Sequence, residues 1–247
     1  MDIINKILSN PPLVHSGETE MKSYSPNDLS IMSAEQQQKY AANAEVCWGI
    51  GEIALRFIQE NVNNDSYTLE VGSGITTLIF AYAETNHICV TPNKSEIDKL
   101  KAYALKEGIS LDKITFINDF SENALPLLKI NYQVDLILID GKHAFPWPFI
   151  DWFYTVNHLK KNGLLLIDDT HLLSGKLLCD FMKNDPNWQF IQVLGGKTEV
   201  FKKLSDNIRD VAWHMQPFLT DFYLANKKKK APFITKVKAK LSSYFKG

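Results

Sequence analysis

Between residues 67 and 203 the chain alternates short apolar runs with longer segments of helical character. The apolar runs are continuous, which is typical of strands covered on both faces. The predicted strands are 67–71, 87–90, 114–117, 134–139 and 163–167. The predicted helices are 76–83, 95–107, 121–128, 148–160 and 175–183. This succession of strands and helices predicts a doubly wound α/β sheet with mostly parallel strands.

The end of this pattern differs from the rest. Two runs rich in strand-forming residues, 188–194 and 198–203, flank the pair Gly195 and Gly196. Two such runs around a glycine pair are typical of a hairpin. The last strand is therefore predicted to run antiparallel to its neighbours.

The remaining segments divide the chain into three predicted parts. Residues 1–62 are expected to form an irregular arm and then a helical region, which begins near Ser33 and runs through Ile58. Residues 63–206 form the predicted α/β domain, and residues 207–247 a C-terminal extension. A chain of 247 residues with 45% hydrophobic residues is long enough for one such domain with accessory segments.

The cysteines and the N-terminus indicate the cellular setting. Cys47, Cys89 and Cys179 are scattered without metal-ligand spacing, so neither a disulfide framework nor a thiolate zinc site is expected. The N-terminus lacks a basic region followed by a long apolar run, and no stretch approaches the length of a membrane span. We therefore expect a cytoplasmic protein.

The net charge of -1 combines two regions of opposite sign. Residues 227–247 hold eight lysines and no acid, so the rest of the chain carries 19 basic and 28 acidic residues. An acidic main domain argues against nucleic acid as a partner. The tail is amphipathic if helical, which would suit peripheral contact with an anionic membrane or a protein, and a solvated tail is the simpler alternative.

Glycines follow the first strand of the predicted domain, in the sequence Glu-Val-Gly-Ser-Gly at positions 70–74. Glycines at this place let backbone N–H groups approach a ligand that a Cβ atom would push away. A turn that merely joins strand to helix is the alternative.

This segment resembles the first motif of the class I S-adenosylmethionine-dependent methyltransferases, and the elements through Lys203 match that family in order and spacing. The resemblance implies a seven-stranded, mostly parallel Rossmann-like sheet with an antiparallel last strand. It also implies S-adenosylmethionine as cofactor, with Glu70 near the methionine amino group and Asp119 near the adenine. The cofactor-binding residues expected on this basis are Glu70, Gly72, Ser73, Gly74, Thr91, Asn118, Asp119 and Asp140.

One position departs from the family pattern. At the end of the second strand the family usually has an acid that binds the ribose hydroxyls, whereas this chain has Thr91. A neutral hydroxyl forms a weaker hydrogen bond than a carboxylate, so either Asn93 or Glu96 compensates or cofactor affinity is low or lost. The missing acid and the terminal hairpin also argue against a nicotinamide oxidoreductase.

Acids end the next two predicted strands, with Asp140 after one and Asp168 and Asp169 after the other. If these strands are neighbours, the carboxylates converge and repel one another unless a cation such as Mg²⁺ neutralises them. The two motifs resemble those of metal-dependent sugar and macrolide O-methyltransferases, in which the matching acids bind the metal. The alternatives are that the acids cap the following segments, or that Lys142 beside Asp140 replaces the metal.

His143 is the candidate general base, with Lys142 and His171 as competitors, and Asp140 completes the predicted catalytic set. The aromatic stretch that begins at Phe145 could line an acceptor pocket. Together these features predict an O-methyltransferase that acts on a small hydroxylated molecule, such as a sugar or secondary metabolite. The alternative is a non-catalytic protein of the same fold that serves binding or assembly.

Overall fold

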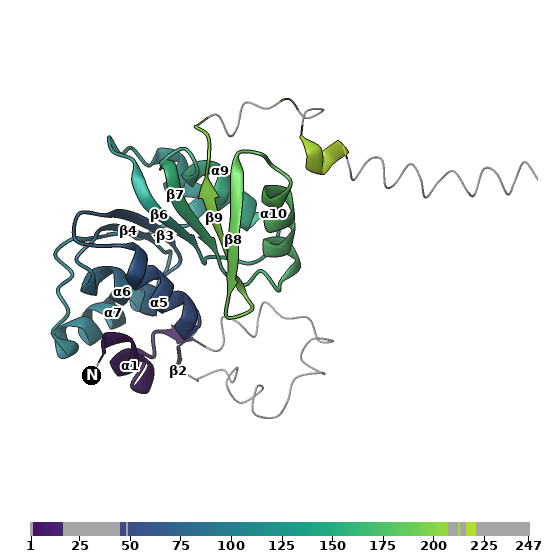
Figure 1. The fold of residues 1–247 in the computed structure, drawn as a ribbon. Coiled ribbons are helices and arrows are strands. Elements are labelled where there is room, and N and C mark those ends of the chain that lie inside the picture. The colour runs from purple at the N-terminus through teal and green to yellow at the C-terminus, as the bar shows by residue number, and fades with distance from the viewer. Residues whose placement is uncertain (1, 17–44, 48, 207–211, 213–215, 221–247) are drawn as a thin grey trace, which may run out of the picture.

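The structure is a computed structural model, and it describes residues 2–16, 45–47, 49–206, 212 and 216–220. Its main feature is one large sheet flanked by helices (Figure 1). The strands of this sheet are β3 (Tyr67–Val71), β4 (Asn86–Val90), β5 (Ile114–Ile117), β6 (Val134–Ile139), β7 (Leu159–Ile167), β8 (Trp188–Leu194) and β9 (Thr198–Lys203). The helices are α1 (Ile3–Ser9), α5 (Glu52–Asn61), α6 (Ile75–Tyr82), α7 (Lys94–Glu107), α8 (Ser121–Ala124), the 3₁₀ helix η1 (Leu125–Leu127), α9 (Trp147–Thr155) and α10 (Leu173–Lys183).

The sheet has the strand order β5-β4-β3-β6-β7-β9-β8. Strands β3 to β7 pair in parallel, and β9 is antiparallel to both of its neighbours. The chain proceeds from β3 toward one edge through β4 and β5, and then returns to the other side of β3 with β6. The predicted doubly wound sheet of seven strands with an antiparallel last strand is therefore confirmed.

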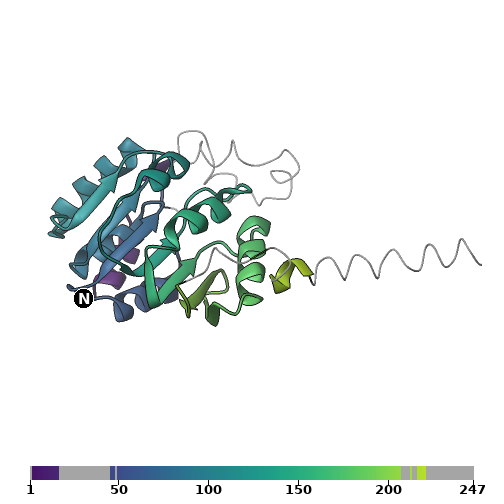
Figure 2. The same cartoon turned by 90° about the horizontal axis from the view of Figure 1, so that it is seen from above.

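Helices cover both faces of the sheet, which gives three layers (Figures 1 and 2). One core cluster lies between the sheet and α1, α5, α6 and α7, and a second lies between the sheet and α9 and α10. Strand β6 contributes to both, because Leu136 and Leu138 face the first cluster while Ile137 and Ile139 face the second. Burial on both faces explains why the strand is apolar without alternation.

The carboxyl ends of the parallel strands lie in one row. Val71 at the end of β3 is paired with Val90 of β4 on one side and with Ile139 of β6 on the other. Val90 is in turn paired with Ile117 of β5, and Ile139 with Ile167 of β7. The loops that follow β3, β4, β5, β6 and β7 therefore begin at the same edge of the sheet. Ligands of open α/β sheets bind at this edge, where the strand order reverses.

The N-terminal residues differ from the expected irregular arm. Residues Ile3–Ser9 form α1, because Ile3, Ile4 and Ile7 recur at helical spacing and are buried in the same core cluster as α5 and α6. A second difference is that residues 45–46, expected to be helical, form the short strand β2 (Glu45–Val46) opposite β1 (His15–Ser16). Ser33, the predicted helix start, lies outside the described residues.

The helix predicted over residues 148–160 is shorter than expected. It ends at Thr155, and β7 begins already at Leu159 rather than at Gly163. The buried Lys203 ammonium donates to the carbonyls of Val156 and Leu159, so a residue from β9 provides partners at the place where the helix stops.

None of the helices in the described part of the chain is long and apolar enough to cross a bilayer. The basic tail at residues 227–247 lies outside the described residues, so its predicted contacts with a membrane or a protein stay predictions.

Candidate functional site

Loops from five strands meet at the carboxyl edge of the sheet, and short backbone hydrogen bonds hold them there. The N–H of Gly72 donates to Val90 O at 3.0 Å, and the N–H of Asp140 donates to Val71 O at 2.9 Å. On either side, the Thr91 N–H donates to Ile117 O at 3.1 Å and the Asp168 N–H to Ile139 O at 3.0 Å. The ladder thus extends one residue past β3, β4, β6 and β7, which fixes where the side chains of these loops begin.

Gly72 is required by close packing between two of these loops. Its φ is +102°, and a Cβ atom built there would lie 2.1 Å from the carbonyl oxygen of Asp140. The sequence predicted a glycine that makes space for a ligand, and this role stays a prediction. The structure shows that Gly72 makes space for the carbonyl oxygen of Asp140, which directly follows β6. Gly72 therefore packs directly against the backbone of Asp140, which is a predicted catalytic residue.

Glu70, the last residue but one of β3, is buried next to the glycine loop. Its side chain is 1% exposed, and it accepts hydrogen bonds from the hydroxyls of Thr76 (2.7 Å) and Thr77 on α6. Thr77 also accepts from the N–H of Gly74 at 3.2 Å. Glu70 therefore ties the loop to the start of the helix, and its predicted contact with the methionine amino group stays a prediction.

Thr91 belongs to a polar group that contains one carboxylate, that of Glu96. Ser73 Oγ donates to Thr91 Oγ1 at 3.2 Å and to Glu96 Oε2 at 3.0 Å. Asn93, the N-cap of α7, donates to Glu96 Oε1 at 2.8 Å. A carboxylate from the first turn of α7 therefore lies beside Thr91. Glu96 was one of the two residues expected to compensate for Thr91, and that role stays a prediction.

The predicted adenine-side residues follow β5 on the same edge. Asn118 donates from its amide to Thr91 O at 3.1 Å, which links this loop to the one after β4. Asp119 is exposed, and its Oδ1 accepts from the N–H of Phe120 at 2.7 Å and from Asn123 at 3.1 Å. Both residues follow β5, the strand next to β4, and their predicted contact with the cofactor stays a prediction.

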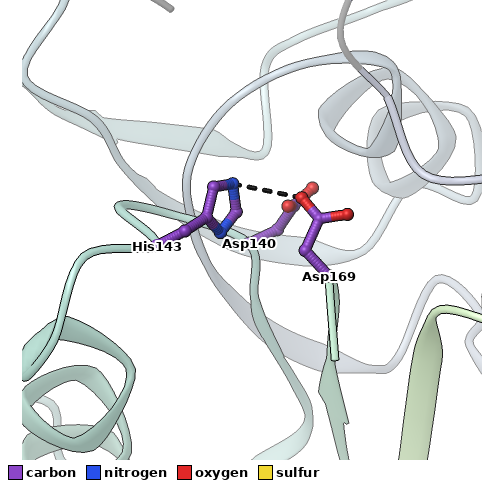
Figure 3. Close-up of side chains that lie close together, drawn as sticks. All are labelled: Asp140, His143 and Asp169. Carbon is purple, nitrogen blue, oxygen red and sulfur yellow. Dashed lines mark ion pairs between the residues drawn. The ribbon is translucent and has the colours of Figure 1, made fainter. Parts of the chain in front are cut away.

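The predicted acids at the ends of β6 and β7 do converge. Figure 3 shows Asp140 and Asp169 facing a common space with His143, and one ligand atom from each of the three lies within 4.8 Å of the others. Burial raises the pKa of the Asp140 carboxyl well above its ordinary value, and the nearby carboxylates of Asp168 and Asp169 raise it further. A charge-balancing cation is therefore expected close by.

That cation is Lys197, which the sequence analysis missed. Its ammonium lies 2.9 Å from Asp168 Oδ2 and 3.1 Å from Asp169 Oδ1. Burial alone would lower the pKa of Lys197, but the two carboxylates outweigh burial and raise it. The lysine lies 28 residues after Asp169 in the sequence and comes from the turn between β8 and β9, so only the pairing of β9 with β7 could have revealed it.

Lys142, the cation expected beside Asp140, lies elsewhere. Its ammonium is 3.6 Å from the centroid of the Trp147 ring, a cation–π contact at the start of α9. Trp147 in turn donates from Nε1 to Glu122 at 3.1 Å. Lys142 is therefore positioned against an aromatic side chain, and no ion pair from it to a carboxylate is found among the described residues.

Of the two histidines predicted as candidate bases, His143 lies closer to Asp169. Its Nε2 lies 3.1 Å from Asp169 Oδ2, whereas His171 Nδ1 is 3.7 Å from the other oxygen of the same carboxylate. The hydroxyl of Ser174 on α10 donates to the backbone carbonyl of His143 and anchors its loop. Asp169 has φ +51°, a left-handed conformation that is uncommon for residues other than glycine and frequent at functional sites.

The residues present fit the predicted all-carboxylate metal site only in part. Mg²⁺ prefers an octahedral set of oxygen ligands. Asp168 is 4% exposed, and both of its oxygens already accept hydrogen bonds, one from Lys197 and the other from Thr198. The group that remains, Asp140, His143 and Asp169, replaces one oxygen ligand with a nitrogen.

Comparison with known proteins agrees with this architecture. Residues 69–170, from β3 to the loop after β7, match a family model described as a methyltransferase domain. No curated protein matches the chain.

Several solved structures share the fold at low sequence identity. The O-methyltransferase TomG from Streptomyces achromogenes, involved in tomaymycin synthesis and solved with SAM, is 11% identical, with a TM-score of 0.53 over 64% of this chain and 82% of that one. Cofactor-bound Rv0187 from MTB is 13% identical, with a TM-score of 0.53 over 63% and 81% of the two chains. A candidate caffeoyl-CoA O-methyltransferase from Staphylococcus aureus is 14% identical, with a TM-score of 0.54 over 82% and 100%.

Proposed function

Because residues 69–170 match a methyltransferase domain model and the sheet has the strand order described above, we propose that the chain is a class I S-adenosylmethionine-dependent methyltransferase that methylates a hydroxyl oxygen of a small molecule. The observation that carries the proposal is the pair formed by His143 and Asp169, with 3.1 Å between Nε2 and Oδ2, beside Asp140. A hydroxyl is a weak nucleophile until its proton is removed, and a histidine oriented by a carboxylate is suited to that task. A sugar or a secondary metabolite would supply such a hydroxyl.

In this proposal the loops after β3, β4 and β5 bind the cofactor. The glycine loop at positions 72–74 lies at the point where the strand order reverses, which is where nucleotide-containing ligands bind in open α/β sheets. Glu96, held by Ser73 and Asn93, is the carboxylate available to the ribose hydroxyls. Asp119 lies one strand further on and would face the adenine.

The acids and the histidine then serve methyl transfer. In this proposal His143 carries its proton on Nε2, which lies 3.1 Å from Asp169 Oδ2, and this tautomer leaves the lone pair on Nδ1 to receive the acceptor's hydroxyl proton. The acceptor oxygen forms a bond to the methyl carbon as the carbon–sulfur bond breaks, and the sulfur keeps that electron pair. Asp169 stabilises the imidazolium that results, and rate enhancement comes mainly from holding the two reactants in line.

The loop after β6 also provides an apolar rim for the acceptor. Phe145 follows His143 by two residues and is 69% exposed, and its ring lies edge-on to Phe149 with 6.2 Å between centroids. An exposed aromatic side chain beside the proposed base favours an acceptor that has an apolar surface next to its hydroxyl. Magnesium has no step in this proposal, because Asp168 is already bonded to Lys197 and Thr198.

The proposal is tested by methyl transfer from labelled S-adenosylmethionine to a panel of sugars, phenols and hydroxylated polyketides. We expect a product that gains one methyl group on oxygen. His143→Gln should lower kcat by about 10²-fold or more, while His171→Gln, the matched control on the more exposed histidine, should change it less than about threefold. Methylation only at nitrogen or carbon, or equal effects of the two substitutions, would contradict the proposal.

A further inference from the structure

The backbone of Lys197 is hydrogen-bonded to the loop after β7. It lies in the turn between β8 and β9, and its carbonyl oxygen accepts hydrogen bonds from both the N–H and the hydroxyl of Thr170, each at 2.9 Å. Thr170 directly follows the two acids Asp168 and Asp169. The turn that carries the lysine is therefore fixed to the loop that carries the acids.

The Lys197 ammonium is bonded to carboxylate oxygens that a metal ion would need as ligands. It lies within 3.1 Å of an oxygen from each of Asp168 and Asp169. Thr198 donates to the remaining oxygen of Asp168, and His143 lies beside the remaining oxygen of Asp169. All four carboxylate oxygens thus have partners from the protein itself.

A divalent ion would meet two penalties at this site. It would have to replace these hydrogen bonds, and its charge would be repelled by the ammonium a few ångströms away. The side chain of Lys197 is 30% exposed and that of Asp168 is 1% exposed, so solvent screens this repulsion only in part. The chain therefore supplies internally the positive charge that three converging carboxylates require.

We propose that Lys197 is the built-in cation of this site and that the protein binds its cofactor and methylates its acceptor without a divalent metal ion. The inference rests on the proposed function only in that it concerns the same site. A salt bridge with a purely structural role would predict that replacing Lys197 lowers stability and changes nothing else. A lysine in the place of the metal predicts in addition that its removal creates a metal site.

The experiment measures Mn²⁺ binding by the loss of the free-ion paramagnetic resonance signal, with the full chain as wild type and variants. We expect the wild type to leave Mn²⁺ free. Lys197→Met should bind Mn²⁺ at least about tenfold more tightly, because it removes a positive charge next to the ligand oxygens. Lys197→Gln provides a second uncharged variant in case the first does not fold, as judged by thermal denaturation.

Two control variants are needed. One keeps the positive charge at position 197, and the other removes a positive charge from a nearby lysine outside the acid cluster. Lys197→Arg retains the cation and should stay metal-free, and Lys142→Met removes a nearby lysine that lies on the Trp147 ring and should also stay metal-free. Adding Asp169→Asn to Lys197→Met should abolish the gained binding. S-adenosylhomocysteine binding to the wild type should be the same with and without a chelator.

The outcomes separate this inference from the proposed function. Tight Mn²⁺ binding by the wild type, or no gain in any folded uncharged variant at Lys197, would overturn the inference and leave the proposed methyl transfer standing. If no hydroxylated acceptor is methylated while the Lys197 variants gain Mn²⁺ as described, the proposed function fails and the role of Lys197 as the site's cation stands.

Discussion

Replacing Gly72 with alanine would place a methyl group where the loops after β3 and β6 meet. The added Cβ would lie 2.1 Å from the carbonyl oxygen of Asp140 and 2.8 Å from its carbonyl carbon, and the φ of +102° disfavours any side chain. Gly108, which ends α7, has a φ of +70°, but no atom lies within 4 Å of the place that its added Cβ would take. Gly108→Ala therefore carries the backbone penalty alone and serves as the matched control.

The expected magnitudes follow from this difference. A left-handed or similar backbone conformation costs an alanine about 1–2 kcal/mol, and both variants have this cost. Forcing atoms into a packed backbone adds roughly 1–3 kcal/mol or more, and only Gly72→Ala has it. We expect the free energy of unfolding to fall by about 1–2 kcal/mol in Gly108→Ala and by about 2–5 kcal/mol in Gly72→Ala.

Urea unfolding followed by circular dichroism measures both values, and calorimetry with S-adenosylhomocysteine measures the effect on the site. Because Asp140 must move to admit the methyl group, cofactor affinity should fall in Gly72→Ala and stay unchanged in Gly108→Ala. Equal losses of stability in the two variants, with affinity retained in both, would show that β3 and β6 do not meet as described.

Two further predictions concern buried charges. The side chain of Asp151 is fully buried, and burial raises the pKa of its carboxyl to about 7. The folded state therefore retains a proton that the unfolded state loses near pH 4. Stability should fall as pH rises from about 4 to 7, by at most about 4 kcal/mol. Asp151→Asn should remove that fall in stability. If the difference in stability between wild type and variant were constant over this pH range, Asp151 would not be the cause of the pH dependence. Lys203→Met should lower the free energy of unfolding by roughly 1–3 kcal/mol, because two buried carbonyls lose their donor; an unchanged or higher value in urea unfolding would contradict this role.

Much of the fold could be predicted because its signals are local. Strands buried on both faces need continuous apolar runs, so β6 could be placed with its observed bounds. The bounds of β3 and of the partly exposed edge strand β5 were also predicted correctly. The pair Gly195 and Gly196 indicated the hairpin that turns the last strand antiparallel. The start of β7 was misplaced because Lys160 and Lys161 lie in an irregular part of the strand, where its pairing with β6 shifts.

The positions of Asp140 and Asp169 could be predicted because each of them directly follows, or nearly follows, the end of a strand. Side-chain direction and long-range pairing were not readable from the sequence. Lys142 is next but one to Asp140 in sequence yet lies on Trp147, whereas Lys197 reaches the acids only because β9 pairs with β7.

In the proposed site the loops after β3 and β4 bind the cofactor, and Glu96 replaces the strand-end acid in whose place this chain has Thr91. Calorimetric titration with S-adenosylhomocysteine tests it on the wild type, on Glu96→Gln and on Glu60→Gln, an exposed glutamate on α5. We predict one binding site, about tenfold weaker binding in Glu96→Gln because charge-assisted hydrogen bonds are lost, and unchanged binding in Glu60→Gln. No heat of binding in the wild type, or equal affinity in all three proteins, would contradict the account.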